Sequence, residues 1–542
     1  METVSITLFL LFAVVVSGAV ARMLPVSVPA PLVQIALGGV IGLSTSYRVE
    51  LDPELFLFLF LPPLLFLDGW RIPKDELFKD LSTVVELALG LVLLTVIGMG
   101  FFIHWLIPAM PLPVAFALAA VVSPTDPIAV SAIAARVPIP KRMMHILEGE
   151  SLLNDASGLV CLRFAVAAAL TGSFSAGSAA LDFLWVAGAG LAIGTVVTLA
   201  VSRAKMWVTR RWGEDSGSQI LVSLLIPFGS YQLAEHVHAS GILAAVAAGV
   251  TMAFTEISRQ ALADTRIRRN SVWDTIQFTL NGIIFVLLGE QLPAILAGAE
   301  QTVALTGHAS PWWLGGYVVA IVAGLAALRF LWVWASLRLT ILRQRDAGAP
   351  RSPDWRLVAT TSFAGVRGAI TLAGVLTLPL AMADGSPFPA RDLAIFLAAG
   401  VIIVSLILAT IALPILLNGL AMPPEPSKQA EEDSARVATA EAAIRAIERH
   451  QHDLAEDHED PDHYASTGAR VMDLYRERID GLIGDRHGFL RQQDAVSTEL
   501  RLVGIRAERA RLLGLIRDRE IGSETAQKLT RELDLSEARL RG

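Results

Sequence analysis

The chain has 542 residues, of which 54% are hydrophobic, and its mean hydropathy is +0.55. A soluble globular protein of this length seldom has such a composition, so that class is excluded. The only cysteine, Cys161, excludes an internal disulfide and a thiolate metal site.

Charge divides the chain into two parts. Residues 1–424 carry 26 acidic and 25 basic side chains, whereas residues 425–542 carry 25 and 19. The formal net charge of −7 therefore lies mainly in the last fifth of the sequence. We predict a transmembrane domain over residues 1–420 and a helical, cytoplasmic, regulatory tail over residues 421–542.

The first apolar segment, residues 5–21, is similar to a signal peptide but lacks the basic residues that precede the apolar core of one. The first positive charge, Arg22, follows the segment. We predict a retained first helix.

Hydropathy predicts about 13 transmembrane helices, which cross the lipid bilayer of the plasma (inner) membrane. They cover residues 5–21, 28–44, 55–70, 81–107, 113–137, 146–170, 181–208, 218–237, 242–255, 271–296, 312–337, 360–380 and 393–417. Alternate loops hold twenty Lys and Arg residues, and the other loops hold only Arg48 and Arg391. Because positive loops stay in the cytoplasm, the N-terminus is predicted outside and the C-terminus inside.

The fifth predicted helix is interrupted by VVSPTDPIAV, which places two prolines and a carboxylate inside an apolar run. Proline donates no backbone hydrogen bond, so Pro124 frees the carbonyl of Ala120 and Pro127 frees that of Ser123. Lipid offers such groups no partner, and the break must therefore face protein or a water-filled cavity. Asp126, an ionisable residue at this depth, is a candidate functional residue.

The twelfth predicted helix carries a matching irregularity, TTSFAGVRGAITLAG, with Gly365, Gly368 and the buried Arg367. Helices five and twelve are an odd number of crossings apart, so they run in opposite directions. Interrupted helices at matching places in oppositely oriented halves are typical of transporters with inverted repeats. We predict an all-α polytopic fold in which two inverted repeats bring two broken helices to a crossing near the midplane.

The sixth predicted helix contains EGESLLNDASG, in which Ser151, Asn154 and Asp155 share a face. A buried carboxylate with hydroxyl and amide oxygens nearby suits a small cation, and the same carboxylate accepts a proton. Cation and proton are therefore predicted to compete at Asp155.

Five polar residues receive predicted roles. Glu150 and Arg367 are predicted to form a structural ion pair between the repeats, since each charge alone would be expensive to bury. Asp126 offsets the positive ends of half-helices at the crossing, and Thr125 offers an oxygen to the ion. Asn281, near the centre of the tenth helix, is predicted to brace the core by hydrogen bonding.

Six segments together resemble the monovalent cation:proton antiporter family of the bacterial NhaP and animal NHE type. They are FLPPLLFLDGW, VVSPTDPIAV, EGESLLNDASGLV, AEHVHASGILAAVAAG, LNGIIFVLLGEQL and FAGVRGAITLA, and they extend from the third to the twelfth predicted helix. The resemblance implies a homodimeric antiporter that exchanges Na⁺, Li⁺ or K⁺ for H⁺ and uses no cofactor.

The resemblance also implies roles for individual residues. Asp155 resembles the ion-binding carboxylate, Ser151 and Thr125 its supporting Na⁺ ligands, and Asn154 the preceding amide. The Asn154–Asp155 order resembles electroneutral members, and one titrating carboxylate would exchange one cation for one proton. A third acid sometimes contributes from the third helix; Asp68 is the candidate, although the sequence places it near the cytoplasmic end.

Alternative interpretations remain open. The same pore acids suit a proton-uncoupled cation channel or an ion-gated membrane sensor, and SPTDP in a soluble protein would be an ordinary loop. An enzyme is disfavoured because the sequence contains no nucleotide loop, zinc motif or credible nucleophile triad, and nothing indicates a nucleic-acid partner. In the tail, four histidines lie close together in sequence: His450, His452, His458 and His463. They indicate either a solvated stretch, or a metal site or pH sensor.

Overall fold

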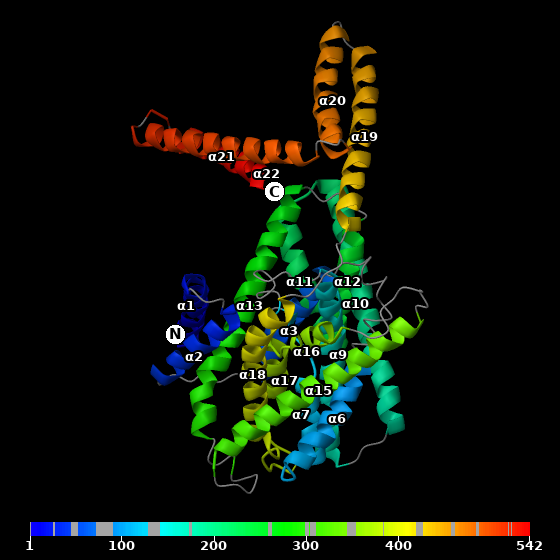
Figure 1. The fold of residues 1–542 in the computed structure, drawn as a ribbon, viewed down its shortest axis with the longest axis vertical. Helices are drawn as coiled ribbons and strands as arrows, with labels where there is room; N and C mark the ends of the chain where they lie inside the picture. The colour runs from blue at the N-terminus through cyan, green and yellow to red at the C-terminus, as the bar shows by residue number, and fades with distance from the viewer. Residues whose placement is uncertain are drawn as a thin grey trace. The chain divides into compact units, whose positions relative to one another are not determined.

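The computed structural model describes residues 2–24, 28–44, 53–71, 90–127, 130, 141–172, 176–257, 263–298, 303, 310–343, 354–382, 384–418, 426–456, 461–483, 487–518, 520–521 and 523–541. This part of the chain is almost entirely α-helical (Figure 1). It forms two compact units, Met1–Ala421 and Met422–Gly542.

The helices of the first unit fall on the predicted apolar segments. They are α1 (Glu2–Met23), α2 (Ala30–Ser44), α3 (Pro53–Arg71), α6 (Leu91–Leu106), α7 (Leu112–Val122), α9 (Lys141–Thr171), α10 (Ala176–Trp212), α11 (Ser216–His236), α12 (Gly241–Ile257), α13 (Ala263–Ala297), α15 (Trp312–Arg343), α16 (Trp355–Phe363), α17 (Ala369–Leu376) and α18 (Arg391–Leu417). The start of the fourth predicted segment and the end of the fifth lie outside the described residues.

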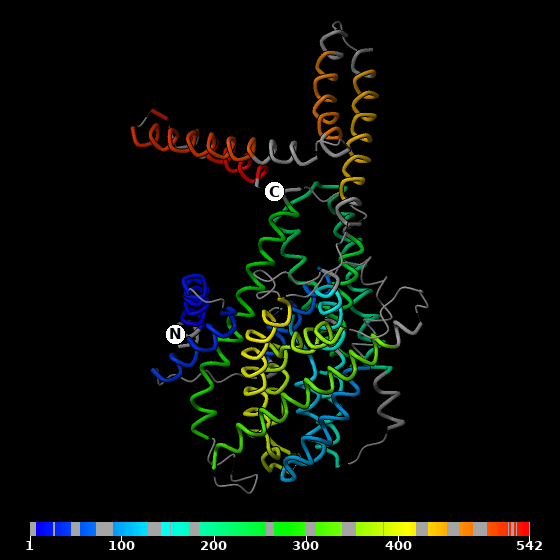
Figure 2. Tube along the Cα trace, viewed as in Figure 1, coloured from blue at the N-terminus to red at the C-terminus, as the bar shows by residue number. Residues whose placement is uncertain are grey.

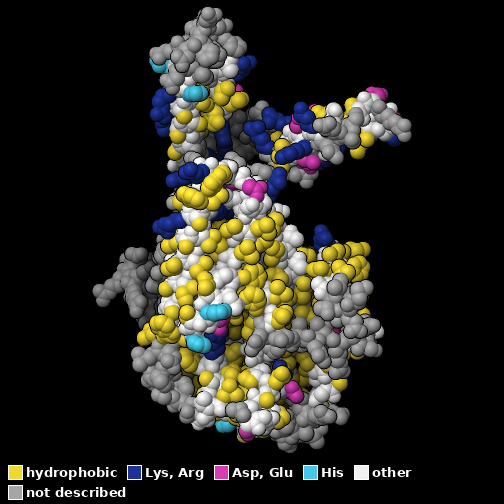
Figure 3. Space-filling model, turned by 180° about the vertical axis from the view of Figure 1, so that it is seen from behind, with side chains coloured by type: hydrophobic (Ala, Val, Ile, Leu, Met, Phe, Trp, Pro, Cys, Tyr) yellow, Lys and Arg dark blue, Asp and Glu magenta, His cyan; other side chains and the backbone are white. Residues whose placement is uncertain are grey.

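Length and composition make several of these helices suitable for crossing a bilayer. In the described part of the chain, five are both long and apolar enough: Met143–Thr171, Leu184–Trp212, Thr265–Ala297, Trp312–Arg338 and Arg391–Leu417. Hydrophobic side chains cover much of the face of this unit in Figure 3. Leu184, Trp185, Leu221 and Leu225 are exposed on α10 and α11, as expected for helices that face lipid.

The helices of the first unit pack in two groups. In the first, here called the core helices, α6, α7, α9, α15, α16, α17 and α18 contact one another. In the second, here called the panel helices, α1, α2, α3, α10, α11, α12 and α13 do the same. Fewer contacts join the groups, mainly from α3 and α13 to α9, α17 and α18.

Two panel helices, α2 and α13, approach each other backbone to backbone. A Cβ added to Gly289 would collide with the carbonyl oxygen of Ile35, and one added to Gly38 would collide with that of Val286. Small residues allow membrane helices to pack this closely, where van der Waals contact replaces the hydrophobic driving force.

The described residues of the second unit form four helices: α19 (Pro426–Glu456), α20 (Pro461–Ile483), α21 (His487–Arg517) and α22 (Ser523–Arg541). Helices α19 and α20 lie side by side as an antiparallel hairpin (Figure 2). On α21, Arg509 forms ion pairs with Asp534 and Glu537 of α22, at 2.5 and 2.7 Å. Formation of these two ion pairs raises the pKa of Arg509.

The structure describes the four histidines of the tail only in part. His450 and His452 are exposed on α19, His458 lies outside the described residues, and the side chain of His463 is not described. Among the described residues, no three His, Cys, Asp or Glu side chains gather as a metal site would require.

Candidate functional site: a polar cavity at the crossing of two interrupted helices

The two predicted interruptions meet in the structure. Helix α7 ends at Val122, and residues 123–126 are not helical. Helix α16 ends at Phe363, and residues 364–368 separate it from α17. The backbone N–H of Asp126 donates to the carbonyl oxygen of Val366 at 2.7 Å, which joins one interruption to the other.

Each interruption satisfies backbone groups that the other leaves free. In a continuous helix the N–H of Asp126 would donate to the carbonyl of Val122. Here that carbonyl accepts from Nε of Arg367 at 2.8 Å, and the Asp126 N–H donates across the crossing instead. Arg367 also donates to the carbonyl of Gly365, and its backbone N–H donates to Ser405 Oγ at 3.2 Å. Proteins pair buried backbone polar groups in this way because unpaired ones are costly in a membrane.

The structure corrects the predicted ion pair between Glu150 and Arg367. The carboxylate of Glu150 is held by Arg329 of α15, whose Nη2 donates to Oε2 at 2.7 Å and whose Nη1 donates to Oε1. Both side chains are buried, with exposed fractions of 0% for Glu150 and 3% for Arg329. Nε of Arg329 donates to the carbonyl of Thr361 at 3.0 Å, so this arginine joins α9 to α16.

The carboxylate of Asp126 lies against the N-terminus of α17. A Cβ on Gly368, the N-cap residue of α17, would overlap the Asp126 side chain. The N-terminus of a helix carries partial positive charge, and a carboxylate beside it is stabilised. This contact supports the predicted electrostatic role of Asp126.

A hydrogen-bond chain connects α9 to the first interruption. Ser151 Oγ donates to the carbonyl oxygen of Thr125 at 2.7 Å, and Asn154 Nδ2 donates to Thr125 Oγ1 at 2.9 Å. Ser151 Oγ also lies 3.4 Å from Asp155 Oδ2. Asp155 is 3% exposed, so its carboxylate is withdrawn from bulk solvent. The sequence predicted that Ser151, Asn154 and Asp155 share a face, and the structure places these residues beside Thr125.

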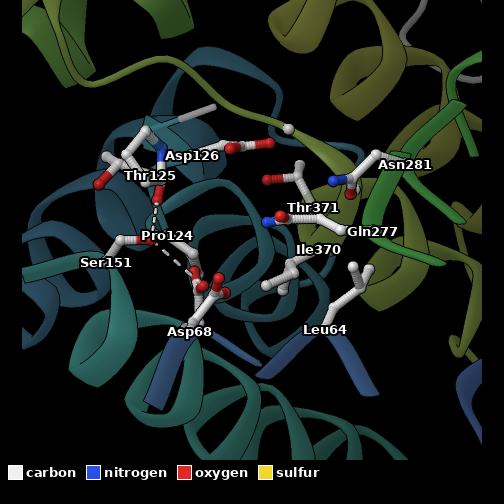
Figure 4. Close-up of a pocket in the computed structure, with 14 residues that line it drawn as sticks. Leu64, Asp68, Pro124, Thr125, Asp126, Ser151, Gln277, Asn281, Ile370 and Thr371 are labelled. Atoms are coloured by element: carbon white, nitrogen blue, oxygen red, sulfur yellow. Dashed lines mark hydrogen bonds between the residues drawn. The ribbon is translucent and has the colours of Figure 1, made fainter. Parts of the chain in front are cut away.

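A cavity of about 30 Å³ lies beside these residues (Figure 4). A volume of this size holds one or two particles as large as water. The cavity is lined by core and panel helices together, through Leu64, Asp68, Pro124, Thr125, Asp126, Pro127, Ser151, Asp155, Gln277, Asn281, Gly368, Ala369, Ile370 and Thr371.

Three carboxylates share this lining: Asp68 of α3, Asp126 of the interruption and Asp155 of α9. The sequence left open whether Asp68 reaches the site, because Asp68 is three residues from the end of its helix. The structure places it in the cavity wall. Repulsion among three acids in a small buried space favours the binding of positive charge.

The panel side of the cavity is formed partly by α13. Asn281 lines the cavity, and Gln277 lies one turn before it on the same face. Sequence reasoning missed Gln277, although its spacing of four from Asn281 could have found it. Gln277 is fixed by the panel, since its Oε1 accepts from Arg71 Nη1 at 2.8 Å.

The fold and the cavity together define a multi-pass membrane protein with an acidic, ion-sized site between two groups of helices. A family model described as sodium/hydrogen exchanger, transmembrane, matches residues 9–419. The chain belongs to this family.

Relatives extend the match to the tail. The chain is 44% identical over 549 residues to a protein of Escherichia coli K12 named as the uncharacterized Na⁺/H⁺ exchanger YjcE, covering 100% of this chain and 99% of that one. It is 39% identical to the sodium, potassium, lithium and rubidium/H⁺ antiporter of Bacillus pumilus, over 98% of this chain and 77% of that one.

A solved structure shows the same fold. The sodium proton antiporter MjNhaP1 of Methanocaldococcus jannaschii matches 78% of this chain and 99% of its own, with a TM-score of 0.58 and 19% sequence identity.

Proposed function

We propose that the protein is a secondary active antiporter that exchanges Na⁺, and also Li⁺ or K⁺, for H⁺ by competition at Asp155. The observation that carries the proposal is the position of the buried Asp155 in a cavity for one dehydrated ion, beside Ser151 and the Thr125 carbonyl. Carboxylate, hydroxyl and carbonyl oxygens are the ligands that hard cations take.

The exchange follows from the electrostatics of the cavity. A buried carboxylate is unfavourable while it is charged and unpaired, and either a bound cation or a proton neutralises it. The site is therefore least costly to move from one side of the membrane to the other when Asp155 holds either a cation or a proton. One carboxylate that alternates between them exchanges one cation for one proton, which makes the cycle electroneutral.

The other two acids have different roles in this proposal. Asp126 lies against the N-terminus of α17, and its carboxylate balances the partial positive charge there. Asp68 lies on the panel side and attracts the cation into the cavity as an accessory residue. Asn154 holds Thr125 in place by its hydrogen bond to Thr125 Oγ1.

Alternating access requires the cavity to open to each side in turn. The cavity lies where core and panel helices meet, and fewer contacts join the two groups than join helices within them. Movement of one group against the other would therefore open the cavity with little internal repacking. The two interruptions and their crossing support a fold of two inverted repeats. The distribution of Lys and Arg among the loops supports an N-terminus outside and a C-terminus inside the inner membrane. We propose a homodimer as the assembled form from the family resemblance.

Everted membrane vesicles test this proposal. With a pH gradient established, addition of NaCl, LiCl or KCl should dissipate the gradient, and choline chloride should not. For an electroneutral exchange, the rate of Na⁺-driven proton movement should be unchanged when the permeant anion thiocyanate collapses the membrane potential. Cation flux that moves no protons would instead identify a channel.

A further inference from the structure

The cavity has two chemically different sides. In Figure 4, Thr125 and Ser151 lie on one side, and Asn281 and Thr371 lie on the other. The first side belongs to the proposed site. The second side brings a panel residue of α13 next to a residue in the first turn of α17.

Both residues of the second side hold a buried oxygen that has no hydrogen-bond partner among the described residues. These atoms are Oδ1 of Asn281, whose residue is 8% exposed, and Oγ1 of Thr371, whose residue is 1% exposed. Leaving a buried polar atom unpaired is expensive, and proteins seldom do so without a function for it. Both residues line the same cavity, which indicates that the missing partner binds there.

Gln277 provides an internal contrast. It lines the same cavity from the same helix, but its Oε1 already accepts a hydrogen bond from Arg71 at 2.8 Å. Its oxygen therefore already has a partner, while Oδ1 of Asn281 and Oγ1 of Thr371 have none among the described residues.

The size of the cavity requires protein oxygens to replace water around a bound cation. At about 30 Å³ it has room for an ion with at most one water molecule. On the first side, Thr125 Oγ1 already accepts from Asn154, and Ser151 Oγ already donates to the Thr125 carbonyl. The Asp155 carboxylate, Ser151 Oγ and the Thr125 carbonyl remain as ligands on that side, because a hydroxyl that donates its hydrogen keeps its lone pairs. A larger cation takes more oxygen ligands than these three groups supply, so the second side must provide the others.

We infer that Oδ1 of Asn281 and Oγ1 of Thr371 complete the coordination shell of the transported cation and set the selectivity among cations. This inference rests on the proposed exchange function and names the residues that decide its substrate range. Neutral oxygens have a weaker field than carboxylates, and cation selectivity depends on the number and field strength of the ligands. The two added oxygens therefore favour larger ions over Li⁺, for which fewer ligands suffice.

The test measures the apparent KM for Li⁺, Na⁺ and K⁺ in proteoliposomes that contain the full-length protein, comparing Asn281→Ala and Thr371→Val with wild type. We expect the ratio of the KM for Na⁺ or K⁺ to that for Li⁺ to rise about fivefold in each variant, since one neutral oxygen ligand is lost. Thr371→Val conserves side-chain volume and gives a result even if Asn281→Ala does not fold. Gln219→Ala on α11 is the matched control, because its buried Oε1 also has no partner among the described residues but lies outside the cavity lining. Its KM ratios should equal those of wild type.

A second measurement does not depend on transport. The increase in thermal unfolding midpoint that KCl gives over choline chloride should shrink in both variants, while the increase given by LiCl should persist. Wild-type exchange with unchanged KM ratios in both variants would overturn the inference and leave the exchange function intact. Absence of cation-driven proton movement in wild type would overturn the exchange function, and the inference with it.

Discussion

Glu150 and Arg329 form a bidentate ion pair that joins α9 to α15 inside the protein. Their side chains have exposed fractions of 0% and 3%, so each charge depends on the other for compensation. Removing one member of such a pair strands the other charge, whereas removing both leaves neutral groups.

The first prediction concerns this pair. Glu150→Gln and Arg329→Gln should each destabilise the protein by about 3–5 kcal/mol, and the double variant by less than the sum. Thermal unfolding of the purified protein in detergent measures the coupling. A cycle between Glu150 and Arg367 is the control, and a larger coupling there would show that Arg329 is not the main partner of Glu150.

The second prediction separates the acids of the cavity. Asp155→Asn should abolish cation-driven proton movement while the protein stays folded, because the group shared by both ions is lost. Asp68→Asn should raise the apparent KM for Na⁺ and preserve exchange, since Asp68 attracts the ion without carrying the proton. Proteoliposome assays measure both variants. Normal exchange in Asp155→Asn would remove the central claim of the mechanism.

The third prediction concerns the crossing. Gly368→Ala should abolish exchange and lower thermal stability, because the new methyl group would occupy the position of the Asp126 side chain. Gly229→Ala on α11 is the matched control, since a Cβ there meets nothing within 4 Å. If Gly368→Ala behaved like Gly229→Ala in unfolding and transport assays, the close contact with Asp126 would not exist.

The fourth prediction concerns pH. If proton and cation compete at Asp155, the apparent KM for Na⁺ should rise about tenfold for each pH unit below the pH at which the carboxylate takes up its proton. At alkaline pH the supply of protons should limit turnover, which gives a bell-shaped activity profile. Initial rates in proteoliposomes measure the profile over about pH 5.5–9.

Truncation after Leu420 separates this competition from a sensor in the tail. The shape of the profile should stay the same, with at most a change in amplitude. A displacement of the acidic limb by about one unit or more would instead assign pH sensing to the region of His450–His463, because imidazoles titrate in the same range.

The sequence predicted the interruptions because their causes are local. Pro124 and Pro127 remove backbone donors, and Gly365 and Gly368 allow a close approach, so the break in each helix can be deduced without tertiary information. The group on α9 could be predicted for a similar reason, since Ser151, Asn154 and Asp155 are neighbours on one turn.

The errors and gaps concern contacts between distant segments. Arg329 lies inside an apolar helix, and nothing in its neighbourhood reveals which helix it faces, so Arg367 was the more evident partner for Glu150. Asp68 and Gln277 reach the cavity because α3 and α13 pack on the core helices at a particular depth. That depth is set by tertiary packing, which hydropathy does not encode.

The contact between Gly38 and Gly289 has a mechanical consequence for transport. Side chains between helices can change rotamer and absorb a displacement, but two backbones in direct contact have no such freedom, and close-packed interiors transmit strain. Helix α13 is therefore held rigidly along α2, and Asn281 lies on this rigid helix. In the proposed exchange cycle, sliding between the two groups of helices would therefore occur on the side of α13 that lines the cavity.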